Sequence, residues 1–275
     1  MSKGAPATGH AHSPVTPEQR RVAKGSPELP INQILHGDSL SLISTFPDRS
    51  IGMVVSDPPF FIGIGRDSGG LGSDPWTRDI GSIESAAAWA RGFTSQFARV
   101  VRLGGAVVVM AGAHAVAAWM LAAEDAGLVW MAELKVLWNT GKPRARNFGS
   151  LHTSILWFTV PGARHSWGAD GRRSIYSNIL MCRKVPVVHR KHSAQKPVEL
   201  TNFLVSLLSK QSDVVLDPFC GSGGSLVSAK LCGRNWIGID KEKSSVTISR
   251  RRVEHAEVEE EGELYLWVNG RLEQI

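Results

Sequence analysis

The sequence predicts an α/β protein built on a doubly wound, mostly parallel β-sheet that is covered by helices on both faces. Short runs rich in apolar and β-branched residues, such as 51–55, 106–110 and 235–239, indicate buried strands. Stretches with apolar residues at helical spacing, such as 83–101 and 197–210, lie between these runs. Strands that are apolar along their whole length and alternate with helices are typical of parallel sheets buried on both sides.

The remaining elements follow from the same patterns. Five prolines among Gly, Ser, Ala and charged residues predict a flexible tail at 1–30. Gly104 and Gly105 are expected to end the helix at 83–101. Asn269-Gly270 suits a type I′ turn, which predicts an antiparallel hairpin within a C-terminal extension, 257–275. Further strands are expected at 34–39, 128–138, 155–160 and 214–216, and further helices at 40–46, 114–126, 225–231 and 241–254.

The composition is that of a globular protein. The 275 residues allow one large domain or two small ones, with 43% hydrophobic and 20% charged residues. No run reaches the roughly eighteen apolar residues that span a membrane, and the N-terminus shows no signal pattern, so we expect a cytoplasmic protein. Cys182, Cys220 and Cys232 are too few for a disulfide framework or a four-cysteine metal site, and no metal is expected.

The first chemical motif is Ser56-Asp57-Pro58-Pro59-Phe60, which directly follows the strand at 51–55. Two prolines prevent further ladder bonding and hold the backbone extended, so the loop presents a carboxylate, backbone carbonyls and an aromatic ring. Oxygens can accept from an exocyclic amine while a ring stacks on the base that carries it. A strand-ending turn would use the same residue types, so this motif alone leaves both interpretations open.

The second motif is a glycine-rich turn, 217–224, between a strand and a helix. Such a turn lets a ligand approach the backbone at the positive end of the helix, and Asp240 after the next strand is placed for ribose hydroxyls. The pair indicates a nucleoside-containing cofactor. A nicotinamide cofactor is disfavoured because Leu226 stands where G-x-G-x-x-G has its third glycine. A tight strand–helix connection is the alternative interpretation.

Positive charge collects between 135 and 196, where Asp170 is the only acidic residue between Glu133 and Glu199. His165, Trp167 and Tyr176 are interleaved with the basic residues, which favours a nucleic-acid surface over a merely solvated face. The basic residues are Lys142, Arg144, Arg146, Arg164, Arg172, Arg173, Arg183, Lys184, Arg190 and Lys191.

Three motifs in one order resemble those of the β-class S-adenosylmethionine-dependent DNA amino-methyltransferases, which act on adenine N6 or cytosine N4. They are Asp57-Pro58-Pro59-Phe60, His192-Ser193-Ala194-Gln195-Lys196-Pro197 and Asp217-Pro218-Phe219-Cys220-Gly221-Ser222-Gly223. The resemblance runs from about 34 to about 254. It implies a Rossmann-like methyltransferase domain at 31–256, in which the catalytic half precedes the cofactor half and a basic target-recognition segment spans about 139–191.

The resemblance also implies roles for individual residues. The target amine would be held by Asp57 and the Pro58 carbonyl in the loop that Pro59 stiffens, and Phe60 would stack on the base. The methionine end of S-adenosylmethionine would be lined by Asp217, Phe219, Gly221 and Gly223. The other cofactor contacts would be Lys196 to the carboxylate, Asp240 to the ribose and Asp38 to the adenine edge. Residues expected to bind DNA are Arg144, Arg146, Arg172, Arg173, Arg183 and Lys184.

The expected activity is methyl transfer to adenine N6 of a base flipped out of double-stranded DNA. A carboxylate pairs with an amine proton more strongly than a hydroxyl does, and in the resembled family Asp at this position usually goes with adenine, whereas cytosine-N4 enzymes more often carry Ser. Cytosine N4, a base in RNA, and a non-catalytic DNA-binding relative are the alternatives. A cognate restriction endonuclease and a homodimer are left open as partners.

Overall fold

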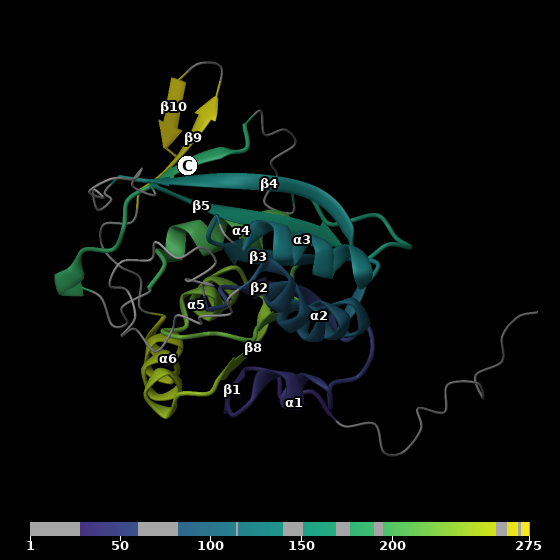
Figure 1. Ribbon diagram of the computed structural model, residues 1–275. Helices are drawn as coiled ribbons and strands as arrows, with labels where there is room; N and C mark the ends of the chain where they lie inside the picture. Colours follow the sequence, from purple (N-terminus) through teal and green to yellow (C-terminus); the bar gives the residue numbers. More distant parts are fainter. Residues whose placement is uncertain are drawn as a thin grey trace, which may run out of the picture.

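The computed structural model describes residues 28–59, 82–113, 115–139, 151–168, 177–189, 195–256, 263–268 and 271–274. Their strands form one ten-stranded sheet in the order β1-β8-β7-β2-β3-β5-β4-β6-β9-β10 (Figure 1). The strands are β1 (Gln33–His36), β2 (Ile51–Ser56), β3 (Val101–Ala111), β4 (Val129–Trp138), β5 (His152–Thr159), β6 (Ile179–Cys182), β7 (Val214–Asp217), β8 (Asn235–Asp240), β9 (Leu264–Val268) and β10 (Arg271–Gln274). The helices are α1 (Ser39–Ile43), α2 (Ile83–Val100), α3 (Val116–Asp125), α4 (Val198–Leu208), α5 (Gly224–Leu231) and α6 (Lys243–His255), with a short 3₁₀ turn, η2 (Val187–His189).

The sheet is parallel from β1 to β3 and mixed beyond it. β1, β8, β7, β2 and β3 pair in parallel, whereas β5 is antiparallel to both β3 and β4. β4 therefore runs in the direction of β3, and β6 follows it because it pairs with β4 in parallel. The carboxyl ends of β1, β8, β7, β2, β3, β4 and β6 consequently lie along one edge of the sheet.

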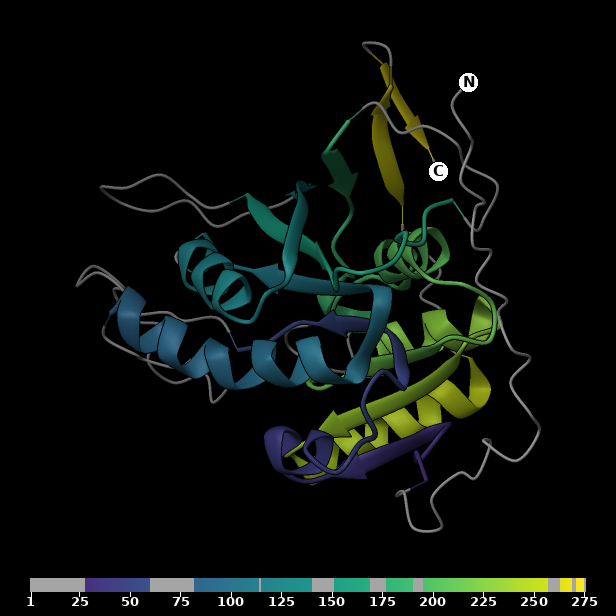
Figure 2. The same cartoon turned by 90° about the vertical axis from the view of Figure 1, so that its right-hand side faces the viewer.

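Helices cover both faces of the sheet, as expected for a doubly wound fold. Alternate residues of β3 point to opposite faces, so Val107 and Val109 join a core with α1, α2 and α3, while Val108 and Met110 join a core with α4. A third cluster packs α5 against α6 through Val227 and other apolar residues. Figure 2 shows α2 and α3 on one side of the sheet and α5 and α6 on the other. The predicted α/β fold is confirmed.

The glycine pair at 104–105 was expected to end a helix, and this expectation was wrong. The helix ends at Val100, and both glycines lie inside β3 beside a register shift between β2 and β3. Gly104 has φ +70°, and a Cβ there would lie 2.5 Å from the Arg164 carbonyl oxygen. A Cβ on Gly105 would lie 2.7 Å from the Gly52 carbonyl oxygen. Close approach of the backbone, to the segment after β5 at Gly104 and to β2 at Gly105, explains the pair.

Two further differences concern the carboxyl-terminal half. β6 was not expected, because the strand has only four residues. Its parallel pairing with β4 is a tertiary contact that no local sequence pattern indicates. The hairpin is confirmed as β9 and β10, and β9 also pairs with β6, so the hairpin extends the main sheet. The expected flexible tail falls mainly on residues 1–27, outside the described residues.

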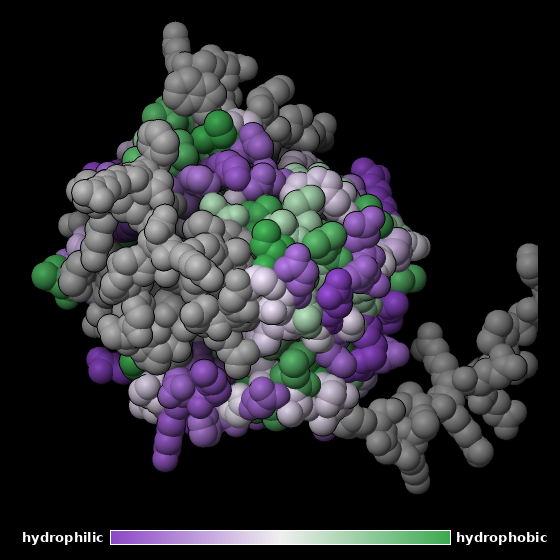
Figure 3. Space-filling view, in the orientation of Figure 1, coloured by the Kyte–Doolittle hydropathy of each residue, from purple (hydrophilic) through white to green (hydrophobic). Residues whose placement is uncertain are grey.

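The outer surface of α6 is polar. Figure 3 shows hydrophilic residues at the lower left of the face in view, over α6, whose Lys243, Arg250 and Arg251 are exposed. None of the helices in the described part of the chain is long and apolar enough to cross a membrane.

Candidate active site

The site lies where the strand order reverses. The chain goes from β2 to β3 in one direction across the sheet and from β7 to β8 in the other, and β2 and β7 are neighbours. Their register pairs Val54 with Leu216, so the loops after Ser56 and Asp217 leave the sheet side by side. Ligands of doubly wound sheets bind in the crevice beyond the carboxyl ends of the strands at such a point.

The Asp57 carboxylate lies at this switch point, directly after β2. Its Oδ2 accepts a hydrogen bond from the Lys196 ammonium group, and the two side chains are 23% and 15% exposed. Its Oδ1 is buried and has no hydrogen-bond partner among the residues that the structure describes. Pro58 is buried and Pro59 half-buried, which fixes the loop that carries the carboxylate. An orphaned carboxylate oxygen is costly unless a ligand donor completes it.

Asp217 ends β7 with a carboxyl group inside the protein. The pKa of Asp217 is raised to about 7, chiefly by burial and to a smaller extent by the nearby Asp57 and Asp240 charges. Two hydrogen bonds oppose this rise in pKa, one from the Ser225 hydroxyl and one from the Phe219 amide at 3.0 Å. The Asp217 side chain thus ties the strand to both the glycine-rich turn and the start of α5.

The glycine-rich turn has the backbone shape that only glycine adopts easily. Gly221 and Gly223 have φ of +48° and +81°. A Cβ on Gly223 would lie 2.8 Å from the Ser249 Cβ, so α6 packs directly on the turn. Asp240 closes the other side, accepting from the Gly221 amide at 2.9 Å and from the Glu242 amide at 2.8 Å. Each carboxylate oxygen has more than one lone pair, so Asp240 retains capacity for a ligand hydroxyl.

Phe219 packs away from the sheet onto α2. Its ring centroid lies 4.9 Å from that of Phe93 and 6.0 Å from that of Trp89. Both α2 residues belong to the apolar face that the sequence predicts, but their contact with the turn was missed. The sequence shows only that two aromatic residues lie one turn apart on that face of α2. Their spacing does not indicate which residue they contact.

Asp38 lies at the same edge, because β1 pairs with β8 and places His36 beside Asp240. Its Oδ1 caps α1 by accepting from the Ser41 amide at 2.9 Å, and this hydrogen bond lowers the pKa of the exposed Asp38 carboxyl group. The next residue, Ser39, donates to the Pro218 carbonyl at 2.6 Å. The Asp38 turn is therefore joined to the glycine-rich turn by a contact that the sequence did not predict.

Two of the residues expected to bind DNA lie at this edge as well. Arg183 and Lys184 directly follow β6, whose carboxyl end lies on the Asp57 side of the sheet. Arg183 forms an ion pair with Glu263 at 3.4 Å, and the Lys184 ammonium lies 5.8 Å from the centre of the Trp138 ring. The other expected contacts, Phe60, Arg144, Arg146, Arg172 and Arg173, lie outside the described residues.

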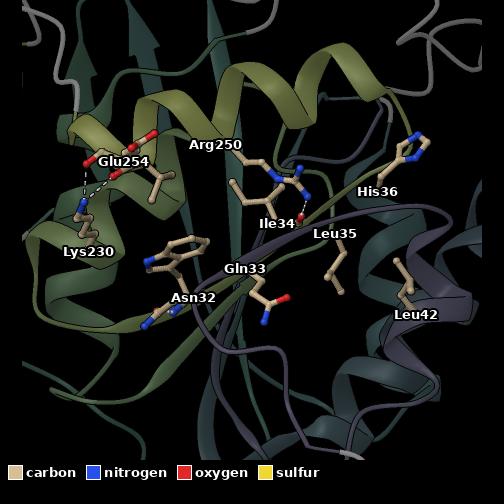
Figure 4. Close-up of a pocket in the computed structure, with 11 residues that line it drawn as sticks. Asn32, Gln33, Ile34, Leu35, His36, Leu42, Lys230, Arg250 and Glu254 are labelled. Atoms are coloured by element: carbon tan, nitrogen blue, oxygen red, sulfur yellow. Dashed lines mark hydrogen bonds between the residues drawn. The ribbon is translucent and has the colours of Figure 1, made fainter.

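A cavity of about 530 Å³ lies elsewhere, along the outer edge of β1 (Figure 4). Its wall includes Trp236 and Arg250, and Arg250 donates to the Ile34 carbonyl at 2.7 Å. Neither Asp57 nor any residue of the 217–224 turn lines it. This cavity is separate from the crevice described above.

Comparison with known proteins identifies the family to which the chain belongs. Residues 51–251, well over half of the chain, match the family model of N6/N4 methyltransferases, described as DNA methylase. The chain belongs to this family of DNA amino-methyltransferases. The match spans both loops of the crevice, from β2 through Asp240 to α6.

Individual relatives agree with this assignment. The chain is 29% identical over 241 residues to the Type II methyltransferase M2.DpnII of Streptococcus pneumoniae, covering 80% of this chain and 89% of that protein. It is 26% identical over 250 residues to the Type II methyltransferase M.HinfI of Haemophilus influenzae, covering 81% and 68%.

Solved structures share the fold. A putative DNA modification methylase from Thermus thermophilus in complex with S-adenosyl-L-methionine has a TM-score of 0.62 at 20% identity, covering 82% of this chain and 95% of that one. The cytosine-N4-specific PvuII DNA methyltransferase has a TM-score of 0.63 at 19% identity, covering 82% and 93%.

Proposed function

We propose that this protein transfers a methyl group from S-adenosylmethionine to N6 of an adenine flipped out of double-stranded DNA. The observation that carries the proposal is the Asp57 carboxylate, whose buried Oδ1 lacks a partner among the described residues beside the glycine-rich turn after β7. An exocyclic amine is a donor that would satisfy this oxygen.

The cofactor site is formed by the residues around the turn, and the groups present suit the cofactor. Gly221 and Gly223 have no side chains, so the cofactor can approach the backbone of the turn closely. Asp240 accepts hydrogen bonds from the ribose hydroxyls, and Phe219 supplies an apolar wall. Asp38 and Asp217 complete the proposed set. S-adenosylmethionine supplies an electrophilic methyl group on a sulfonium. The complexes of the Thermus methylase and of M1.HpyAVI with this cofactor support the assignment by fold.

Asp57 and the Pro58 carbonyl hold the amine by accepting one hydrogen bond from each of its two N–H groups. The amine lone pair is delocalised into the ring of the base, and these hydrogen bonds would favour a more tetrahedral nitrogen whose lone pair is available for bonding. In-line positioning of this kind supplies on the order of 7–11 kcal/mol in favourable cases. Phe60 stacks on the flipped base, whose extrusion costs a few kcal/mol. Transfer would leave S-adenosylhomocysteine and a positively charged methylated nitrogen, which would lose one proton to Asp57 or to water. A strong base is therefore not required.

Adenine is the proposed target because the acceptor at position 57 is an acid. A charged acceptor forms a hydrogen bond about twice as strong as a neutral one. Cytosine N4 is the second candidate, supported by the fold shared with the cytosine-N4-specific PvuII enzyme. Both bases present an amine beside a ring nitrogen, so the geometry of the site does not distinguish them. The identity of the methylated nucleoside does.

Nucleoside mass spectrometry on DNA methylated by the purified protein tests the proposal. We expect N6-methyladenine, and none from the Asp57→Ala variant. N4-methylcytosine without N6-methyladenine would overturn the choice of base, and no methylated nucleoside on any DNA would overturn the activity. Long-read modification mapping of DNA from cells that express the protein gives the recognition sequence.

The proposed partners are tested separately. Light scattering of the purified protein tests whether it is a homodimer. A restriction endonuclease that cleaves unmethylated DNA at the same recognition sequence would be its partner.

A further inference from the structure

The ion pair between Lys196 and Asp57 joins two loops that are 139 positions apart in the chain. Lys196 directly precedes Pro197, the residue that caps α4, and its backbone lies beside α5, because a Cβ on Gly224 would be 3.4 Å from the Lys196 carbonyl oxygen. Rigid helices therefore hold the lysine backbone in place. The side chain reaches from this support to the carboxylate at the end of β2.

We propose that Lys196 is a positioning residue for Asp57: its ammonium group holds Oδ2, and this leaves Oδ1 directed toward the target amine. The proposal deepens the methyl-transfer function proposed above and rests on it. A carboxylate with one oxygen fixed has its plane fixed too, so the second oxygen keeps one direction. The structure agrees with these separate roles of the two oxygens. Oδ2 pairs with the Lys196 ammonium group, and Oδ1 has no hydrogen-bond partner among the described residues.

The charges in the crevice explain why a cation is needed there. Asp57 and Asp240 are both close enough to Asp217 to raise the pKa of its buried carboxyl group. Like charges repel, and a carboxylate just after the end of a strand can turn toward solvent to relieve that repulsion. The Lys196 ammonium opposes this movement, since an ion pair that is largely shielded from water is weakened little by salt.

This assignment differs from the role that the resemblance implies, in which Lys196 faces the cofactor carboxylate. The two roles lead to different losses. A cofactor contact would appear in the affinity for S-adenosylmethionine, whereas a positioning contact would appear in the rate of transfer at saturation.

The test compares Lys196→Met and Lys196→Arg with the wild type. Single-turnover rates are measured with DNA and S-adenosylmethionine at saturation, and cofactor affinity is measured by calorimetry. We expect Lys196→Met to transfer methyl about 10²-fold more slowly, the usual cost of a small misplacement, with a dissociation constant for the cofactor within about twofold of the wild type. Retained affinity also shows that the variant is folded. Lys196→Arg keeps the charge and should recover part of the rate.

Lys230→Met is the matched control. The Lys230 ammonium is also held by two hydrogen bonds, to the Val253 and Glu254 carbonyls at 2.8 Å each, but these acceptors end α6 beside the β1 cavity (Figure 4). The same substitution there should leave the transfer rate unchanged.

A second comparison asks whether Lys196 acts through Asp57. In an Asp57→Asn background, Lys196→Met should lower the residual rate of methyl transfer little, because Asp57→Asn has already removed the ion pair through which Lys196 acts. An equal loss in both backgrounds would overturn the proposal. So would a wild-type rate in Lys196→Met, or a normal rate at saturation with cofactor affinity weakened more than about tenfold. Failure of the proposed function would instead show in the wild type, as no transfer at all.

Discussion

Three carboxyl groups meet in the crevice, and their surroundings make them different. Asp57 has an ammonium partner, Asp240 accepts from two backbone amides, and Asp217 is fully enclosed with a hydroxyl and an amide. Enclosure favours the neutral form of an acid, which is why the pKa of Asp217 rises. The residue names alone did not distinguish these states, because burial and neighbours decide them.

Asp217 should make stability depend on pH. Its pKa rises from 3.8 in the unfolded chain to about 7 in the folded protein, so the folded state binds the proton more tightly. Its contribution to stability is complete below pH 3.8 and is lost as the pH rises through about 7. Urea titrations between these values should show the wild type losing up to about 1.4 kcal/mol per pH unit relative to Asp217→Asn.

The Ser225→Ala variant provides the control for this pH dependence. The Ser225 hydroxyl lowers the pKa of Asp217 by hydrogen bonding to its carboxylate, so its removal should move the loss of stability to higher pH. Parallel pH profiles for wild type and Asp217→Asn would show that Asp217 does not titrate in this range.

Asp57 and Gly221 should separate chemistry from cofactor binding. Asp57→Ala removes the acceptor for the amine and should abolish methyl transfer while S-adenosylmethionine still binds. Gly221→Val places a branched side chain on a backbone with φ +48° beside the cofactor and should abolish that binding. Calorimetry with the cofactor distinguishes the two. Loss of cofactor affinity in a folded Asp57→Ala variant would contradict the division of the site.

Gly223 should be more sensitive to substitution than its φ alone requires. Gly127 has a similar φ of +72°, and a Cβ placed there would meet none of the described atoms within 4 Å. Gly127→Ala should therefore cost only the left-handed conformation, about 1–2 kcal/mol. Gly223→Ala adds a clash 2.8 Å from the Ser249 Cβ and should cost more. Urea unfolding of both variants measures the difference, and equal losses would mean that α6 yields easily.

At the scale of elements, the sequence predicted strands and helices well and their contacts poorly. β2, α2 and the β7-α5-β8 unit lie where apolar periodicity placed them, because each carries a local signal. The Lys196–Asp57 pair, the Ser39–Pro218 hydrogen bond and the seat of Phe219 on α2 were not predicted. These contacts join segments far apart in the chain, and no local pattern encodes them.

Helix α2 should support the cofactor loop through one aromatic residue. Phe93 contacts Phe219, whereas Phe97, one turn further along, pairs with Phe93 at 6.1 Å between ring centroids. Both side chains are buried, so Phe93→Leu and Phe97→Leu should each cost about 0.5–3 kcal/mol of unfolding free energy. Only Phe93→Leu should also weaken S-adenosylmethionine binding, as measured by calorimetry. Equal effects on affinity would mean that general loosening of the core, and not this contact, governs the loop.

At the scale of the whole molecule, the sheet gathers its functions on one edge. β2 and β7 deliver Asp57 and the glycine-rich turn there, and β4 and β6 run in the same direction. The segments that follow β4 and β6 contain seven of the ten basic residues between 135 and 196: Lys142, Arg144, Arg146, Arg183, Lys184, Arg190 and Lys191. Strand direction thus places the described starts of these segments, Asn139 and Arg183, at the same edge of the sheet as Asp57, which charge composition alone did not predict.

DNA binding should therefore depend on salt through this segment. If Arg144, Arg146, Arg172 and Arg173 contact phosphates, each neutralisation removes roughly 0.9 from the slope of log affinity against log salt concentration. A variant with all four changed to alanine should bind a DNA duplex more weakly and with a slope flatter by roughly 3.6. Fluorescence anisotropy across a salt series measures both quantities.

The control for the salt series replaces Arg250 and Arg251, exposed residues of α6 on the side of the sheet that faces away from α2 and α3. Because these two arginines lie on a helix distant in sequence from the basic segment, their replacement by alanine should leave the slope unchanged. An unchanged slope in the fourfold variant would mean that the segment is a solvated face. A single arginine whose loss relaxes sequence preference without changing the slope would instead be one that contacts a guanine edge.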